Sequence, residues 1–405
     1  MKVAPINLGF VSSRSAYVDS AEKVWADPGV ARLLQAMSAR SQKLTVAMSR
    51  SPERRHYHVD RLPGDAAFVA LPWMPSLAGA FHKVLPARKA IRRVEQQSDV
   101  VIAQLPFETP LALLRPTKPR VYHICADVMS MARSSANYAG YKRMPALLMG
   151  RTVDAIHRRL IGSPHARLIA NGEALYTFYG RPPGRAIVSS ALLEGEIMSV
   201  RRLRPTDAPF RILYVGFLRR AKGIDVLLDA YWSLLAHLPS AELVIVGDQD
   251  KVEPSLASDL PKLHERGHIE LVGHKEFGPD LFQQFADADV LALPSRSEGT
   301  PRVLVEARAF GCPVVATSVG GIPTSVTHEL DGLLVPVNDP VALATALLRI
   351  AQDESLRQRL IAAGLERARR STVEAFAETM ICEAHAARQP DKAEQQHLKV
   401  LGEIP

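Results

Sequence analysis

Cysteine is scarce in this chain of 405 residues. The three cysteines lie far apart and form no CxxC or Cys/His cluster: Cys125, Cys312 and Cys382. The sequence therefore argues against a disulfide or zinc framework, and it favours a protein kept in a reducing cytoplasm.

Long hydrophobic runs are also lacking. The most apolar stretch, 66–85, is interrupted by prolines, a histidine and a lysine, whereas a membrane-spanning helix needs about 20 apolar residues. The first residues lack the charged-then-apolar layout of a signal peptide. We therefore expect a cytoplasmic protein, either free or peripheral on the inner face of the cell membrane.

Common nucleotide-binding and nucleic-acid-binding signatures are missing too. The chain has neither the P-loop pattern GxxxxGK[ST] nor a GxGxxG. A simple kinase or a dinucleotide enzyme is therefore disfavoured. No zinc-finger, RRM or KH signature supports a nucleic-acid partner.

Charge, in contrast, is plentiful and unevenly distributed. The chain is 23% charged with a net charge of +8, but residues 1–190 have a balance of +15 and the remainder of −7. Basic pairs recur in the first half: Arg54-Arg55, Arg88-Lys89, Arg92-Arg93, Lys142-Arg143 and Arg158-Arg159. This asymmetry indicates an anionic partner, either a membrane surface or a phosphate-bearing acceptor. The simpler alternative is a solvated basic face.

The C-terminal half alternates short apolar strands with amphipathic helices. The expected strands are 210–216, 242–247, 268–273, 290–294, 313–317 and 332–337. The expected helices are 224–238, 279–288, 301–310, 340–352 and 355–370. Continuous apolar strands between helices predict a parallel sheet covered on both faces, as in a doubly wound α/β domain.

The N-terminal half has a similar pattern with less clearly marked helices. Its strand-like runs are 44–48, 67–71, 99–104, 120–125, 168–171 and 186–190. Because a single core stops growing at roughly 250–300 residues, two domains are expected. We predict a domain at 1–196, a linker at 197–209, a second domain at 210–371, a helix at 372–388 that crosses back to the first domain, and a tail at 389–405.

The densest chemical signal is the turn that follows the strand 290–294. Pro301 suits the first position of a helix, and Gly311 suits its C′ position. Such a turn brings free helix N–H groups to the carboxyl edge of the sheet, where they can bind a diphosphate. Gly299 would let the backbone approach the ligand closely.

Two glutamates bracket this anion site. Carboxylates repel phosphate but accept hydrogen bonds from sugar hydroxyls, so Glu298 and Glu306 suit the sugars of a nucleotide sugar. The alternative is that Glu298 is a loop carboxylate near a helix start and that Glu306 faces solvent.

A second turn combines glycine with cations before a helix. Gly216 ends a strand, and Arg219, Arg220 and Lys222 follow within six residues. Cations at this edge would neutralise a diphosphate leaving group. A turn with surface charges is the plain alternative.

Together these motifs resemble the C-terminal domain of the retaining GT-B glycosyltransferases of family 4, over residues 211–370. Four features match in order: the Gly216…Lys222-Gly223 turn, the run 287–295 into Glu298-x7-Glu306, the run 311–323 with Gly320-Gly321, and the run 331–340. Each motif alone is weak, but four in this order with family-like spacing are strong.

The resemblance implies a GT-B fold, in which two Rossmann-like domains face a central cleft and the C-terminal one holds the donor. Glu306 would hold the ribose hydroxyls, Glu298 the transferred sugar, and Lys222 the diphosphate. The donor-binding set is completed by Gly216, Arg220, Gly299, Thr300, Pro301, Arg302 and Val303. A UDP- or GDP-sugar would be the donor, transfer would retain the anomeric configuration, and neither a metal nor another cofactor would be needed.

Two departures from the family pattern concern catalytic positions. Phe217 stands where the family often has an arginine, and we expect Arg219 or Arg220 to replace it, with Arg219 favoured. In the N-terminal half, His123 falls inside a strand, and Asp127 lies nearer the place of the family's usual histidine. Asp127 would contact the donor sugar or the acceptor; alternatively, it caps the next segment and His123 is a packed core residue.

The favoured function is a retaining glycosyltransferase of bacterial surface or exopolysaccharide synthesis, with a glycan or diphospho-lipid-linked acceptor. One alternative is a sugar-nucleotide epimerase or a phosphorylase on the same fold. Another is a degenerate, non-catalytic binding protein, which would bind polyanions with a steep salt dependence.

Overall fold

The computed structural model of the chain describes residues 5–55, 57–73, 81–107, 109–129, 143–205, 207–248, 252–253 and 268–389. It divides into two compact units. The N-terminal unit comprises Met1–Ile187 together with Val373–Pro405, and the C-terminal unit comprises Val188–Thr372.

The boundary between the units differs from the expected one. The segment 188–209, predicted to be the end of one domain and a linker, is grouped with the C-terminal unit. Met198 donates its N–H to the carbonyl of Ala309 at 3.0 Å, and Leu203 donates to the carboxylate of Asp287 at 2.7 Å. These bonds fix the segment to the C-terminal unit, which its irregular sequence does not indicate.

The N-terminal unit is built on a parallel sheet. Its strands lie in the order β5 (Ala67–Leu71), β3 (Lys43–Arg50), β1 (Asn7–Val18), β6 (Val100–Leu105), β7 (Arg120–Ile124), β8 (Ala166–Asn171) and β9 (Gly184–Ile187). The end of β1 continues past the sheet and pairs antiparallel with β2 (Val24–Ala26), which in turn pairs with β4 (Asp60–Arg61). This antiparallel extension was not expected from the sequence.

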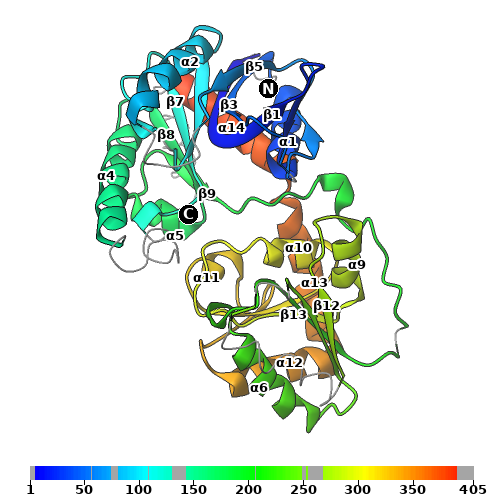
Figure 1. The fold of residues 1–405 in the computed structure, drawn as a ribbon. Helices are drawn as coiled ribbons and strands as arrows, with labels where there is room; N and C mark the ends of the chain where they lie inside the picture. The colour runs from blue at the N-terminus through cyan, green and yellow to red at the C-terminus, as the bar shows by residue number, and fades with distance from the viewer. Residues whose placement is uncertain are drawn as a thin grey trace, which may run out of the picture. The chain divides into compact units, whose positions relative to one another are not determined.

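Helices cover both faces of this sheet (Figure 1). On one side α2 (Val84–Gln96) and α4 (Arg143–Ile161) contact the strands. On the other side α1 (Pro28–Ser38) packs against α14 (Val373–Arg388), which contacts β6, β7 and β8. The last helix therefore completes the core of the first unit, although almost two hundred residues separate it from β9.

The C-terminal unit holds a second parallel sheet. Its strands lie in the order β12 (Ile269–Gly273), β11 (Glu242–Val246), β10 (Arg211–Val215), β13 (Val290–Leu293), β14 (Val314–Thr317) and β15 (Leu333–Val335). Every pairing in it is parallel. Each unit is therefore a doubly wound α/β domain, and this predicted fold class is confirmed.

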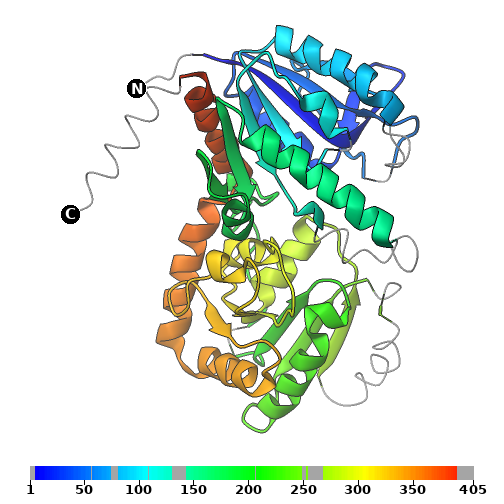
Figure 2. The same ribbon diagram turned by 90° about the vertical axis from the view of Figure 1, so that its left-hand side faces the viewer.

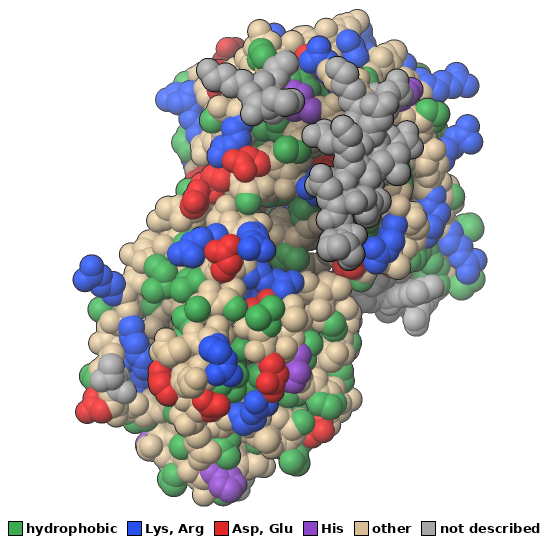
Figure 3. Space-filling view, turned by 180° about the vertical axis from the view of Figure 1, so that it is seen from behind, with side chains coloured by type: hydrophobic (Ala, Val, Ile, Leu, Met, Phe, Trp, Pro, Cys, Tyr) green, Lys and Arg blue, Asp and Glu red, His purple; other side chains and the backbone are tan. Residues whose placement is uncertain are grey.

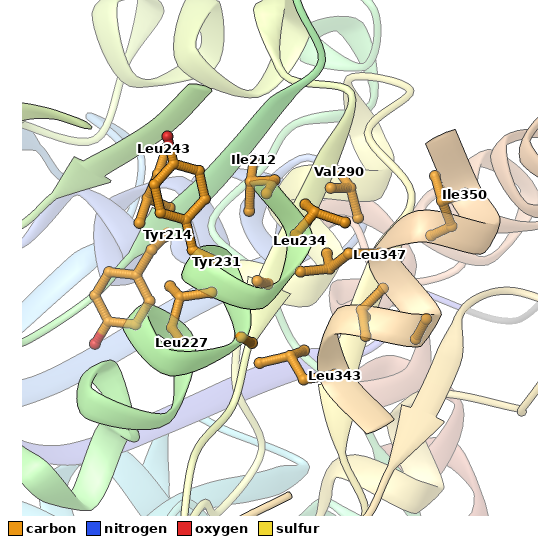
Figure 4. Close-up of a cluster of buried hydrophobic side chains, with 14 of the residues drawn as sticks. Ile212, Tyr214, Leu227, Tyr231, Leu234, Leu243, Val290, Leu343, Leu347 and Ile350 are labelled. Atoms are coloured by element: carbon orange, nitrogen blue, oxygen red, sulfur yellow. The ribbon is translucent and has the colours of Figure 1, made fainter. Parts of the chain in front are cut away.

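Two apolar layers enclose this second sheet. Below it, α6 (Ile224–Leu235) and α12 (Pro340–Gln352) lie side by side (Figure 2), and their leucines meet strand residues such as Ile212 in a buried cluster (Figure 4). On the opposite face lie α9 (Pro279–Asp287) and α10 (Val303–Ala309). The helix α13 (Glu354–Arg369) begins against the first layer and ends against the second.

The surface carries charges of both signs in the C-terminal unit, where acidic and basic side chains are interspersed (Figure 3). On the N-terminal unit some basic residues have acidic partners: Arg92 pairs with Glu95 and Arg158 with Asp154. The Lys142-Arg143 pair lies outside the described side chains. Among the described residues, no helix has the length and apolarity to cross a membrane, and no group of His, Cys, Asp and Glu could hold a metal ion.

Candidate functional site

The candidate site lies at the carboxyl edge of three adjacent strands of the C-terminal unit. The strand order reverses between β10 and β13, because β11 and β12 extend to one side of β10 and β13 to β15 to the other. In open parallel sheets, ligands bind at such a switch point, beyond the carboxyl ends of the strands. The loops that leave β10, β13 and β14 are 216–223, 294–302 and 318–321, respectively.

The loops after β10 and β13 are joined by an ion pair. The ammonium of Lys222 lies 2.7 Å from Oε1 of Glu298. Ser295 donates its hydroxyl to the same carboxylate oxygen at 2.8 Å. The Glu298 side chain is only 8% exposed, so the carboxylate is held in one orientation beside a cation. Both charged residues could be predicted from the sequence, whereas the role of Ser295 depends on the fold of the loop.

Glycines bring the three loops into contact. A Cβ on Gly223, whose φ is +70°, would lie 2.0 Å from the carbonyl oxygen of Pro294. A Cβ on Gly320 or Gly321 would lie 1.9 Å from the carbonyl of Glu298 or 2.0 Å from that of Gly299. No side chain fits at these contacts, because two backbones occupy the space that it would need. Gly299 differs, since a Cβ there would meet no atom within 4 Å.

This difference predicts opposite effects for two glycine substitutions. Gly321→Ala should lower the free energy of unfolding by about 1–3 kcal/mol, because its methyl overlaps the backbone of the neighbouring loop. Gly299→Ala should change stability by less than about 0.5 kcal/mol but weaken nucleotide binding roughly tenfold, because the methyl would occupy the approach of a diphosphate. Thermal unfolding and calorimetry measure the two effects. Unchanged nucleotide affinity in Gly299→Ala would remove this glycine from the site.

The helix after this turn begins later than the sequence predicts. α10 starts at Val303 with Arg302 as its N-cap, so Pro301 precedes the helix and is not its first residue. Pro301 is buried, whereas Gly299 and Arg302 are exposed and Thr300 is partly buried. The end of the helix is as predicted: Gly311 has a φ of +74°, as the C′ position requires.

Glu306 is a buried carboxylate on α10. It is 9% exposed, and in the part of the chain that the structure describes its side chain has no hydrogen-bond or ion-pair partner. Burial raises the pKa of Glu306 to about 7, opposed only weakly by the guanidinium of Arg302. A buried carboxylate without a partner costs free energy, so it indicates a position kept for a ligand. The alternative that Glu306 faces solvent is wrong.

Buried ion pairs hold α10 in place. Arg308, on the same helix, is 2% exposed and bonds Asp331 at 2.9 Å and the carbonyl of Ser325 at 2.8 Å. Arg367 of α13 bonds the other oxygen of Asp331 at 2.5 Å. The helix that carries Glu306 is thereby fixed to two neighbouring segments. These ion pairs could not be predicted from the sequence, because only the tertiary fold brings the residues together.

The basic turn after β10 exposes two arginines. The phenol of Tyr214 donates to the carbonyl of Phe217 at 2.8 Å and fixes the start of the turn next to Gly216. The guanidinium of Arg219 lies 5.0 Å above the ring of Phe217, at the surface. The backbone N–H of Arg220 bonds Glu253. Lys222, the third cation of the turn, pairs with Glu298 of the next loop at 2.7 Å.

The N-terminal candidates belong to the other unit. His123 lies in β7, is 3% exposed, and packs edge-on against Phe376 of α14 at 5.0 Å. It is therefore a core histidine, as the structural alternative predicted. Asp127 accepts a hydrogen bond from the N–H of Met129 at 2.8 Å, which is the capping geometry. Asp127 belongs to the N-terminal unit, whereas Lys222, Glu298 and Glu306 belong to the C-terminal unit.

Sequence comparisons identify relatives of the C-terminal unit. Residues 209–353 match the family described as glycosyl transferases group 1. The chain is 35% identical to a D-inositol 3-phosphate glycosyltransferase of Thermobifida fusca over 225 residues, which cover 50% of this chain and 51% of the relative. It is 30% identical to the amylovoran biosynthesis glycosyltransferase AmsK of Erwinia amylovora, over 52% of this chain and 57% of the relative. The chain thus spans about half the length of the curated relatives it matches.

Structural comparisons extend over nearly the whole chain. A sucrose-phosphate synthase of Thermosynechococcus elongatus superposes with a TM-score of 0.65 at 19% identity, covering 96% of this chain and 99% of that one. HepE of Anabaena, solved with UDP and glucose, gives a TM-score of 0.59 at 18% identity over 94% and 99%. At such identities these likenesses show the fold alone. The stretch 209–353 therefore resembles the group 1 glycosyltransferases, and over nearly its whole length the chain has the GT-B fold.

Proposed function

We propose that the chain is a retaining glycosyltransferase that binds a nucleotide-diphosphate sugar in its C-terminal unit. The observation that carries this proposal is Glu306, a buried carboxylate without a partner among the residues that the structure describes, near the switch point of a parallel sheet. The two hydroxyls of a ribose can both donate to one carboxylate. A bound ribose would supply the hydrogen bonds that Glu306 lacks in the described part of the chain.

The ion pair beside it suits the other end of the donor. Lys222 would neutralise the diphosphate as charge develops on the leaving group, where a point charge on a flexible stem can follow the phosphates. Glu298, held by Ser295, would accept hydrogen bonds from hydroxyls of the transferred sugar. In the free protein the two side chains neutralise each other. Donor binding would replace this single contact by contacts to the phosphate and the sugar.

The exposed residues of the two turns would complete the donor site. Backbone N–H groups from Thr300 to Val303 precede or begin α10, where the first helical N–H groups have no partner within the helix. Arg219 and Arg220 would add positive charge at the rim. We propose UDP as the nucleotide, because HepE, which has the same fold, was solved with UDP and with UDP-glucose.

The acceptor would be a glycan or a phosphorylated or lipid-linked sugar. The relatives named above act on D-inositol 3-phosphate or in amylovoran biosynthesis, and both names indicate a hydroxylated acceptor. We assign acceptor binding to the N-terminal unit, with its positive net charge. Asp127 would contribute to acceptor binding through its carboxylate, which also accepts the N–H of Met129.

A transfer assay tests the proposed activity. The protein is incubated with UDP-glucose, UDP-galactose or UDP-N-acetylglucosamine and a panel of sugar, phosphosugar and polyprenyl-diphosphate sugar acceptors. We expect UDP release above the hydrolysis of the donor alone, and an α-linked product from an α-linked donor by NMR. A β-linked product would contradict retention, and no turnover with any pair in the presence of measured UDP binding would favour the non-catalytic alternative.

A further inference from the structure

A hollow of about 470 Å³ opens in the N-terminal unit, and none of the residues assigned to the donor in the C-terminal unit lines it. It lies beside the middle of β1, the end of β3 and the chain that leaves β5. Its lining is polar and aromatic: three serines, an arginine, an aspartate, a tyrosine and a tryptophan. This composition is typical of sites that bind hydroxylated rings, which need stacking surfaces and fixed hydrogen-bonding groups.

A β-bulge in β1 builds one wall of the hollow. The pairing of β1 with β3 shifts between Ser12 and Ser15, so that Ser13 and Arg14 are extra residues in the strand. Both line the hollow. Bulges redirect side chains and are frequent next to functional sites. The sequence gives no hint of this bulge, because it depends on the register between two strands.

The buried side chain of His58 orients the hydroxyl of Ser15, another residue that lines the hollow. His58 is 1% exposed, and its Nδ1 accepts the backbone N–H of Arg55 at 3.0 Å. Burial and the neighbouring cations of Arg55 and Arg54 lower the pKa of His58, so its ring is neutral and Nε2 carries the proton. Nε2 then donates to the hydroxyl of Ser15 at 3.0 Å. The proton of Ser15 is thereby directed either to Tyr57, 3.2 Å away, or to a ligand.

The two carboxylate oxygens of Asp27, which lines the hollow, have different surroundings. Its Oδ1 caps α1 by accepting the N–H groups of Gly29 and Val30. Its Oδ2 has no hydrogen-bond partner among the residues that the structure describes. A carboxylate anchored through one oxygen and open at the other is a fixed acceptor for a ligand hydroxyl.

Arg14 supplies an available cation. Its side chain is 48% exposed, and its nearest acid, Asp27, lies 3.8 Å away, too far for a hydrogen bond. A guanidinium in this state can bind a carboxylate or phosphate with two parallel hydrogen bonds. Trp73 and Tyr57 line the same hollow and bring aromatic rings to it. Stacking surface, hydroxyl acceptor and anion binder therefore occur together.

We propose that this hollow binds a sugar or polyol ring that carries one acid group, with the ring against Trp73, a hydroxyl on Asp27 and the acid group on Arg14. The inference rests on the proposed function in one respect, namely that this ligand is the acceptor of the transfer. The shared chemistry, a hydroxylated ring with an anion, has two sources: a phosphosugar or a uronic acid.

The test is calorimetric titration of the full chain with D-glucose 6-phosphate, D-glucuronate, D-glucose and inorganic phosphate. We expect one of the two acidic sugars to bind at least tenfold more tightly than both glucose and phosphate, which identifies the source of the acid group. Arg14→Gln should remove this preference and leave the weak binding of glucose unchanged. Trp73→Ala should weaken every sugar. Asp27→Asn, which keeps a good N-cap, should weaken the sugars without unfolding α1.

Arg359→Gln is the matched control, because it removes the same charge from an exposed position on α13 in the other unit. UDP binding is measured in parallel for every variant and should not change. If UDP binds normally but neither acidic sugar binds, or if Arg14→Gln and Trp73→Ala bind them as the wild type does, the hollow is not this site and the donor proposal stands. If both acidic sugars bind as predicted while UDP does not, the hollow stands and the donor proposal fails.

Discussion

Replacing Lys222 by methionine should reduce kcat/KM for sugar transfer by about 10²–10³-fold, the typical loss when one preorganised group that stabilises developing charge is removed. Methionine keeps the length of the side chain and removes the charge. The diphosphate would then leave without a cation at the switch point, and the carboxylate of Glu298 would keep only its bond to Ser295. Steady-state kinetics with the natural donor measure the effect.

Two further variants separate charge from structure. Lys222→Arg retains the positive charge and should recover part of the lost rate, limited by the different shape of the guanidinium. Lys89→Met makes the same change at an exposed position of α2 and should leave transfer unaffected. If Lys222→Met transferred sugar at the wild-type rate, Lys222 would be a structural partner of Glu298 and nothing more.

Glu306→Gln should stabilise the free protein at high pH while it weakens nucleotide binding. The pKa of Glu306 is about 7 in the folded protein, against 4.5 as its ordinary value. Below pH 4.5 the carboxyl of Glu306 is protonated in both the folded and the unfolded state, so its burial does not lower the free energy of unfolding through ionisation. Between pH 4.5 and 7 the unfolded chain loses its proton first, so stability falls as the pH rises. Above pH 7 the carboxyl is ionised in both states, and the free energy of unfolding is lower by about 3 kcal/mol, as the size of the pKa difference gives.

Glutamine removes this titration because it is neutral at every pH. The variant and the wild type should therefore have similar free energies of unfolding at pH 4.5, and the variant should be more stable by up to about 3 kcal/mol at pH 8. Urea unfolding at both pH values measures the difference. Glu366→Gln, at an exposed position of α13, is the control and should show no such trend. Equal stability of Glu306→Gln and wild type at pH 8 would mean that the carboxylate is not desolvated.

Much of the C-terminal site could be predicted from the sequence, because its signals are local. A glycine after an apolar strand, a cation before a helix and a glutamate inside it are each visible within a few residues. The three loops meet because parallel strands end at one edge, which the alternation of strands and helices already implies. The burial of Glu306 is decided only by the structure, since the sequence also allows this side chain to face solvent.

The remainder depends on contacts between distant segments. The antiparallel extension of β1, its bulge at Ser13 and Arg14, and the capping role of Asp27 result from strand register and chain crossing. No pattern of neighbouring residues encodes them. Helix boundaries show the same limit on a smaller scale, since Pro301 fits a first helical position by type but precedes α10 in the structure.

The central claim is that Glu306 holds the ribose of a nucleotide donor, and calorimetric binding of UDP and GDP without added metal tests it most directly. The account predicts micromolar binding of one nucleotide, with UDP expected, to the wild type, and binding at least tenfold weaker to Glu306→Ala and Glu306→Gln. Equal affinity of the wild type and both variants for that nucleotide would contradict the claim, because the buried carboxylate assigned to the ribose would then make no contact with it.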